Sequence, residues 1–418
     1  MTASRHNRSQ LFFGWRVVAA AFVLAMFGWG FGFYGPPVYL YAVREARGFS
    51  LMLVSAAVTL HYLSGALVAA NLARLYRAFG TPTVTKASAL SLALGVTGWA
   101  AAAEPWQLLV ATLFSGAGWV GLSAAGINAI LAPWFVRRRP AALAMAYNGA
   151  SVGGIVFQPL WVVAIEALGF VNAAVLIGIV MVLVVWVLAD RFVAQSPEAM
   201  GVAPDGDAPG APVAAVTVST ARPLPGRALY ASPAFITLAG GMALGLFAQV
   251  GLLSHLLSAL VPALGPTTAG LLMGAATAAA IVSRTLFGWL MRPGADRRRA
   301  AVLSYAIQIA GCGLLIASGG KDFGLIVAGT LLIGSGIGNA TSLPPMIAQV
   351  EFVTEDTARV VGLIVAISQA GYAFAPAVFG VFRELFASDA ALYSAAALVQ
   401  ALAMGCFIVG RQRGSKSV

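Results

Sequence analysis

The chain has 418 residues, of which 60% are hydrophobic and only 9% are charged, and its formal net charge is +11. A soluble domain carries about 25% charged residues, so the composition excludes a soluble globular protein and indicates one that crosses a membrane many times. The arginine clusters have no aromatic stacking surface between them, so the positive charge does not indicate a nucleic-acid partner.

Twelve segments are long enough to cross a bilayer, which takes about 20 apolar residues in a helix. We expect all of them to be α-helical, because lipid offers backbone groups no other hydrogen-bond partner. In chain order the expected segments are 12–42, 51–72, 84–103, 106–135, 141–165, 170–189, 233–260, 267–291, 300–318, 323–348, 357–382 and 389–410. The expected fold class is therefore an all-α membrane protein with twelve transmembrane helices.

The lysine and arginine residues predict the orientation, since such residues concentrate in cytoplasmic loops. With the N-terminus in the cytoplasm, the outer loops hold only Arg44, Arg47, Lys321 and Arg383. The first apolar run begins near Leu11 and is too long for the apolar part of a signal peptide, so we expect it to be retained. We expect a multi-pass protein of the plasma membrane, the inner membrane in a bacterium, with both termini cytoplasmic.

The longest polar connection, 190–232, is rich in Pro, Gly and Ala, which is typical of a flexible linker. It divides the chain into an N-terminal six-helix half, 1–189, and a C-terminal six-helix half, 233–418. The stretch NGASVGGIVFQP, from Asn148, aligns without gaps with VAISQAGYAFAP, from Val365, in the equivalent segment of the other half. Duplicated halves with a site between them are a common transporter plan, so we expect two pseudo-symmetric bundles.

One arginine, Arg284, stands inside the apolar stretch AAAIVSRTLFGWLM, with no acidic residue within eleven positions on either side. A charge inside a membrane segment is costly and usually functional, and all fourteen acidic residues fall in loops or at expected helix ends. Arg284 therefore either extends along its helix towards the cytoplasm or binds an anionic substrate. Its planar fork suits a carboxylate, and one cation without a second favours a monoanion.

The other polar residues in the apolar segments allow two interpretations each. His61, in the middle of the second segment, either carries a proton during transport or stays neutral and hydrogen-bonded between helices. Tyr34, Asn128, Gln369 and Tyr372 either line a substrate cavity or make ordinary interhelical hydrogen bonds.

The sequence contains no nucleophile–base pair and no metal-ligand cluster. Cys312 and Cys406 both lie in apolar runs and have no metal-binding spacing. The glycine-rich stretches GWGFGFYG and GSGIGN lack the preceding strand and the following lysine of a phosphate loop. We therefore expect no enzyme activity, no cofactor and no metal. The Gly35-Pro36-Pro37 run is expected to break the first helix near its outer end.

Three stretches carry a resemblance to a known family: FFGWRVVAAAF in the first segment, WFVRRRPAALAMAYNGASVGGIVFQP around the loop after the fourth, and SRTLFGW in the eighth. Over nearly its whole length the chain resembles a major facilitator superfamily transporter, most closely the branch of monocarboxylate transporters and oxalate/formate exchangers. The resemblance implies that Arg284 holds the substrate carboxylate. It also implies that helices 1, 4, 5, 7, 8, 10 and 11 line the path, which favours Tyr34, Asn128, Gln369 and Tyr372 as further substrate-binding residues.

Several positions depart from the family pattern. Arg77 stands where the loop after the second helix usually has an aspartate, so the gating ion pair of that loop cannot form in the same way. Ala280 and Gly35 replace the aspartate and lysine of animal members, so their proton route does not carry over. The eleventh segment has no lysine, which disfavours oxalate exchange.

The sequence thus predicts a secondary active transporter that moves a small organic monoanion, of the monocarboxylate type, by alternating access. Proton symport is the preferred coupling, with His61 as the proton-coupling candidate, while uniport and anion exchange stay open. The alternatives are an efflux carrier of the same fold for drugs or other metabolites, and a membrane sensor that binds without transporting. We expect a monomer whose partners are a small anion, protons and the lipid bilayer.

Overall fold

A computed structural model describes residues 12–207, 226–291 and 295–414, and every regular element in these ranges is a helix. The helices are α1 (Phe13–Gly32), α2 (Gly35–Arg47), α3 (Leu51–Phe79), α4 (Thr81–Ala101), α5 (Pro105–Trp119), η1 (Val120–Leu122), α6 (Ala124–Leu131), α7 (Arg139–Leu168), α8 (Phe170–Leu188), η2 (Ala189–Val193), η3 (Pro204–Gly206), α9 (Gly226–Ala231), α10 (Pro233–Leu264), α11 (Pro266–Leu290), α12 (Arg297–Ala317), α13 (Phe323–Glu351), α14 (Thr354–Tyr372), α15 (Ala375–Phe386) and α16 (Asp389–Gly414). The expected all-α fold is confirmed. Residues 208–225 of the expected linker lie outside the described residues.

The helices supply the twelve segments that the sequence predicts. Within the described residues, eleven helical segments are long and apolar enough to cross a membrane. The twelfth, α4, has 21 residues but is less apolar, and it packs between α5 and α8. Four segments consist of more than one helical piece: α1 with α2, α5 with η1 and α6, α8 with η2, and α14 with α15.

The breaks inside these segments have local causes. A proline ends the preceding helix but is accommodated in the first turn of the next one, where its missing N–H is not needed. Pro36 begins α2 in this way, as expected, and Pro376 begins α15. The break at Ser123, between α5 and α6, has an extended backbone and was not predicted. Pro159, the counterpart of Pro376 in the sequence repeat, lies inside α7 without ending it.

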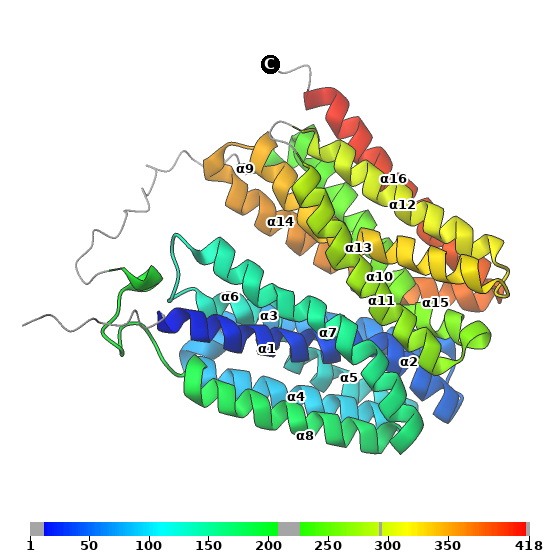
Figure 1. The fold of residues 1–418 in the computed structure, drawn as a ribbon, viewed down its shortest axis with the longest axis horizontal. Helices are drawn as coiled ribbons and strands as arrows, with labels where there is room; N and C mark the ends of the chain where they lie inside the picture. Colours follow the sequence, from blue (N-terminus) through cyan, green and yellow to red (C-terminus); the bar gives the residue numbers. More distant parts are fainter. Residues whose placement is uncertain (1–11, 208–225, 292–294, 415–418) are drawn as a thin grey trace, which may run out of the picture.

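The helices pack as two groups, α1–α8 and α10–α16, which lie side by side in Figure 1. In the first group α1 packs against α7, and α4 against α5 and α8; in the second, α10 packs against α14 and α16, and α12 against α13 and α16. The two groups meet where α7 packs on α11, α3 on α15, and α2 on α10. The repeated sequence therefore occupies α7 in the first group and the junction of α14 with α15 in the second.

The groups are joined at one end of the molecule, called here the far end, which holds the turns at 48–50, 169 and 265. There the backbone N–H of Met52 donates to Glu384 Oε2 at 2.9 Å, and that of Ala377 donates to Thr59 Oγ1 at 3.1 Å. Gly380 allows close approach, since a Cβ there would lie 2.3 Å from Ser55 Oγ.

Towards the opposite end, where α1 begins and α16 ends, the two groups diverge in Figure 1. Among the described residues, the hydrogen bonds between the groups run from the far end only as deep as Arg284 and Ser151. Beyond this level Leu67 of α3 is 72% exposed. This second end, the terminal end, is therefore the open one.

The start of the linker is anchored to the first group by Asp205. Its carboxylate accepts hydrogen bonds from the backbone N–H groups of Val136, Arg137 and Arg138 at 3.2, 2.9 and 3.1 Å, and its own N–H donates to the carbonyl of Trp134. Burial raises the pKa of this carboxyl, but the three backbone donors and the Arg137 guanidinium outweigh burial and hold the pKa below its usual value. The linker thus leaves the membrane helices along the α6–α7 loop.

Candidate substrate site

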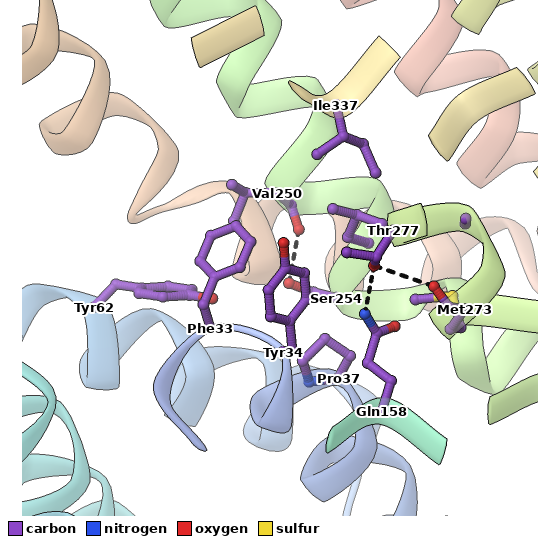
Figure 2. Close-up of a pocket in the computed structure, with 12 residues that line it drawn as sticks. Phe33, Tyr34, Pro37, Tyr62, Gln158, Val250, Ser254, Met273, Thr277 and Ile337 are labelled. Atoms are coloured by element: carbon purple, nitrogen blue, oxygen red, sulfur yellow. Dashed lines mark hydrogen bonds between the residues drawn. The ribbon is translucent and has the colours of Figure 1, made fainter. Parts of the chain in front are cut away.

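A small cavity lies between the two groups, below the far-end contacts (Figure 2). The break between α1 and α2 presents Phe33 and Tyr34 to it, and α3 adds Tyr62. The other lining residues come from α2, α7, α10, α11 and α13: Pro37, Gln158, Val250, Leu253, Ser254, Met273, Ala276, Thr277 and Ile337. Its volume is about 10 Å³, close to the minimum for one water molecule. In this conformation the cavity therefore has no room for a substrate larger than a water molecule.

Glycines bring the walls of this cavity together. A Cβ at Gly154 of α7 would lie 2.7 Å from the Tyr34 ring and 2.6 Å from the methyl group of Thr277. Three residues before Thr277 on α11, a Cβ at Gly274 would lie 3.0 Å from the carbonyl oxygen of Ile155. Side chains at these two glycines would force the groups apart, so the glycines fix how closely α7 and α11 approach.

One hydrogen bond crosses the cavity between the groups. Gln158 Nε2 of α7 donates to Thr277 Oγ1 of α11 at 2.8 Å, and the Thr277 hydroxyl donates to the carbonyl of Met273 at 3.2 Å. Gln158 is only 3% exposed, and its Oε1 has no hydrogen-bond partner among the described residues. Gln158, which lines the cavity, thus carries a buried acceptor oxygen without a donor.

Arg284 lies two turns from Thr277 on α11, towards the terminal end, and does not line the small cavity. Its Nη2 donates to Ser151 Oγ of α7 at 3.3 Å, so the side chain points at the opposite group rather than at lipid. A Cβ added at Gly338 of α13 would lie 3.3 Å from the Cβ of Arg284, so α13 packs closely against this part of α11. Among the described side chains no carboxylate forms an ion pair with Arg284, which is partly exposed.

A family model described as the Major Facilitator Superfamily matches residues 8–376. The chain belongs to the Major Facilitator Superfamily. It is therefore a multi-pass membrane transporter for a small-molecule substrate, and not an enzyme. The superfamily that the sequence predicts is confirmed.

Solved structures of superfamily transporters have the same fold. The nucleoside transporter NupG aligns with a TM-score of 0.69 and 14% identity, covering 98% of this chain and 100% of that one. The D-xylose–proton symporter aligns with a TM-score of 0.72 and 13% identity, covering 94% and 97%. A bacterial homologue of the human lysosomal transporter Spinster, inward-facing and occupied, aligns with a TM-score of 0.67 and 14% identity, covering 97% and 98%.

At such low sequence identity these structures show the fold of the chain but not its substrate. These structures are of nucleoside, xylose and Spinster-type transporters, so they do not bear out the monocarboxylate branch within the superfamily. No curated protein sequence matches the chain significantly.

In this member of the superfamily, His61 lies beside the cavity but does not line it. Its Nε2 lies 2.9 Å from the carbonyl oxygen of Gly32, and its Nδ1 lies 2.9 Å from Ser115 Oγ. Since a carbonyl can only accept, Nε2 carries the proton, and a neutral ring then accepts at Nδ1. The ring is 1% exposed and stacks on Trp119, with centroids 5.9 Å apart. These contacts fully satisfy a neutral histidine that joins α3 to α1 and α5.

The five predicted substrate-binding residues are spread over the site and its approach. Tyr34 lines the cavity, and Tyr372 packs edge-on against Tyr62, which also lines it, with centroids 5.9 Å apart. Asn128 of α6 donates to the carbonyl of Ala124 and to the hydroxyl of Tyr147, away from the cavity. The remaining two lie towards the terminal end: Gln369 is exposed on α14, and Arg284 bonds the opposite group as described.

The residues that sequence reasoning did not single out for the site are Ser151, Gln158 and Thr277. Gln158 was visible as one of several polar residues in apolar segments, and Ser151 falls in the repeated stretch. Their importance follows from the crossing of α7 and α11, which brings positions 119 and 133 residues apart in sequence into hydrogen-bond contact. A single sequence carries no signal of that pairing.

Proposed function

We propose that this superfamily member is a secondary active transporter that moves a small organic monoanion of the monocarboxylate type, with Arg284 as the group that binds the carboxylate. The observation that carries the proposal is a guanidinium between the two groups that hydrogen-bonds a serine hydroxyl and forms no ion pair with any described carboxylate. Donors of this fork remain for an incoming anion, which can bind it bidentately.

The position of Arg284 supports a role in the transport cycle. It bonds a residue of the opposite group at the deepest point of the closed region, so an anion bound there touches the boundary that must open and close. In apolar surroundings the attraction between the two charges is several times stronger than in water. Bound substrate would neutralise the site, and a loaded carrier would therefore close and reorient more easily than an empty one.

The orientation of the transporter follows from its charge distribution, and we propose a plasma-membrane location with cytoplasmic termini. The open terminal end then faces the cytoplasm, which makes this an inward-facing conformation. We also propose a monomer, with 1–189 and 233–418 as the two halves and 190–232 as the connecting linker. Alternating access would require the contacts at the far end to separate while the terminal end closes.

Arg284 variants test the proposal in liposomes that contain the purified protein. Arg284→Ala should abolish uptake of the carboxylate that the parent protein transports best. Arg284→Lys should reduce uptake by roughly tenfold or more, because a point charge does not replace the two-pronged donor. Arg74→Lys, at an exposed position of α3, is the matched control. Unchanged uptake by Arg284→Ala would refute the carboxylate assignment.

We also propose that transport is coupled to protons and that His61 carries the proton. The hydrogen bonds of its two ring nitrogens define what protonation would have to change. A coupling histidine must take up a second proton at Nδ1, which now accepts from Ser115 Oγ. Uptake driven by a pH gradient in the parent, but not in a His61→Gln variant that still exchanges substrate at equilibrium, would support coupling. An unchanged pH dependence in that variant would leave His61 with its interhelical role alone, and uniport or anion exchange would be the mechanism.

A second function, an efflux carrier of the same fold, is favoured by one observation: Arg284 lies on the α7–α11 contact and outside the small cavity, whose walls are mainly apolar and aromatic. Liposome transport of lipophilic cations, compared with that of small carboxylates, separates the two functions. Cation transport that survives Arg284→Ala, without any carboxylate transport, would favour efflux.

A further inference from the structure

We infer that the transported anion carries a hydrogen-bond donor, a hydroxyl or an N–H, at the end remote from its carboxylate, and that Gln158 Oε1 accepts it. This inference rests on the proposed function, because it takes Arg284 as the carboxylate site. It adds a second recognition point and thereby names the substrate class: a hydroxylated or amino-substituted monocarboxylate with an apolar body.

The first step is the unsatisfied acceptor itself. Gln158 is 3% exposed, lines the cavity between the groups, and its Oε1 has no partner among the described residues. A buried polar atom without a partner is unfavourable, and nearly all such atoms in folded proteins find a donor. A substrate that supplies this donor gains a hydrogen bond in a place where water has little room to compete.

The orientation of the Gln158 amide follows from its neighbour. The Thr277 hydroxyl hydrogen points at the carbonyl of Met273, so its oxygen lone pairs face Gln158 and require the amide nitrogen there. The amide oxygen is then the atom of this group that has no hydrogen-bond partner, and Figure 2 shows only the nitrogen bonded to Thr277. Gln158 is therefore an acceptor towards the substrate, and the rotation of its amide group is held by Thr277.

The second step is the spacing between the two recognition points. Ser151 and Gln158 are seven residues apart on α7, and their partners Arg284 and Thr277 are seven apart on α11, in the antiparallel sense. Seven residues of α-helix rise about 10 Å. A carboxylate and a donor that each make one hydrogen bond of about 3 Å to these points are then separated by roughly 5 Å.

The third step concerns what lies between these points. Gly154 falls midway between Ser151 and Gln158 on α7, and the Tyr34 ring packs directly over it. Around the cavity, Phe33 and Tyr62 add further aromatic surface. The substrate body that joins carboxylate and donor would therefore be apolar and would contact Tyr34.

The cavity volume fits the donor end alone. About 10 Å³ accommodates one water-sized group, such as a hydroxyl, in the cavity that Gln158 lines. The rest of the substrate would occupy the space towards Arg284 once Tyr34 moves aside. A resident water at this position is the competing occupant, and it would make the protein indifferent to the donor on the substrate.

Matched pairs of acids test the inference. The probes are 4-hydroxybenzoate against benzoate, and 4-hydroxybutyrate against butyrate, measured as affinity for the purified full-length protein and as uptake into liposomes. The parent should bind the hydroxylated member of at least one pair roughly tenfold or more tightly, because a site that receives a hydroxyl rejects the analogue without it. Gln158→Leu should remove this preference while benzoate or butyrate still binds.

Thr277→Val is the second variant, in case Gln158→Leu does not fold. It frees the amide of Gln158 to rotate, so the preference should shrink without vanishing. Equal affinities within both pairs in the parent would overturn this inference and leave the carboxylate proposal standing. So would a preference that persists unchanged in Gln158→Leu. Binding of none of the four acids would overturn the proposed function, and this inference with it.

Discussion

The ion pair between Arg298 and Glu351 gives a quantitative prediction about stability. Arg298 of α12 is 2% exposed, and it donates to Glu351 of α13 from Nε at 2.5 Å and from Nη2 at 2.7 Å. The same guanidinium donates to the carbonyl of Ala234 at 3.1 Å and to Thr237 Oγ1 at 3.2 Å, both on α10. One buried cation therefore holds three helices of the second group at the terminal end.

Glu351→Ala removes the only described counter-ion of this buried guanidinium. Breaking a buried pair in this way costs about 3–5 kcal/mol, since the remaining charge stays out of water. Because Glu351 keeps 27% of its side-chain surface exposed, we expect the lower part of that range, about 3 kcal/mol. Arg298→Met with Glu351→Leu should cost less than Glu351→Ala alone, because the double change leaves no unpaired charge.

The assay is unfolding of the purified protein in detergent, measured by denaturant titration and by the thermal midpoint, for the parent, Glu351→Ala and the double variant. Glu198→Ala, which removes an exposed acid that forms no ion pair among the described residues, serves as the control for loss of charge. A cost below about 1 kcal/mol for Glu351→Ala would match an exposed surface pair. That result would refute the argument that burial makes this pair important.

Three further predictions concern closure, the site and the linker. Glu384→Ala should favour opening of the far end two- to fivefold, because a carboxylate at the first turn of a helix is worth about 0.3–1 kcal/mol; faster thiol labelling of a cysteine placed at Ser55, which is buried against Gly380, would measure it, and an unchanged rate would contradict it. Gly154→Leu should stop substrate binding without unfolding the protein, since the new side chain meets the Tyr34 ring, and unimpaired binding would count against the site. The lowered pKa of Asp205 means that its stabilising contribution is complete above about pH 4 and lost as the pH falls through the lowered value; Asp205→Asn should lower the thermal midpoint at pH 7 and flatten its acid dependence, and parallel pH profiles would disprove the role.

The fold was largely predictable, because the physical signal for membrane helices lies in the length and apolarity of local stretches. The break at Gly35-Pro36-Pro37 was predictable for the same reason, since proline acts on its own turn. The repeat suggested that Pro159 and Pro376 are equivalent, yet only Pro376 begins a new helix. The surroundings of α7 and α14 decide that difference, and a local pattern does not contain them. The break at Ser123 had no proline signal.

The candidate site was predictable only in part. Arg284 stands out in sequence because a charge in an apolar run has few structural explanations. Gln158 and Thr277 do not stand out, because neutral polar residues are common in membrane helices and most make ordinary hydrogen bonds. What distinguishes Gln158 is that it lines the cavity between the groups and also has an oxygen without a donor, which depends on the Thr277 hydroxyl pointing at Met273. Such a distinction exists only in three dimensions.

The contacts that join the two groups have a consequence for how the carrier responds to its medium. Every ion pair between described residues lies within one group or between a group and its adjoining loop, and none crosses the boundary. Dissolved salt weakens attraction between exposed charges, but it has no such attraction to weaken here. The balance between the inward-open and outward-open conformations should therefore depend only weakly on ionic strength, through contacts such as that of Glu384 with the first turn of α3, and be governed mainly by the charge of the bound substrate.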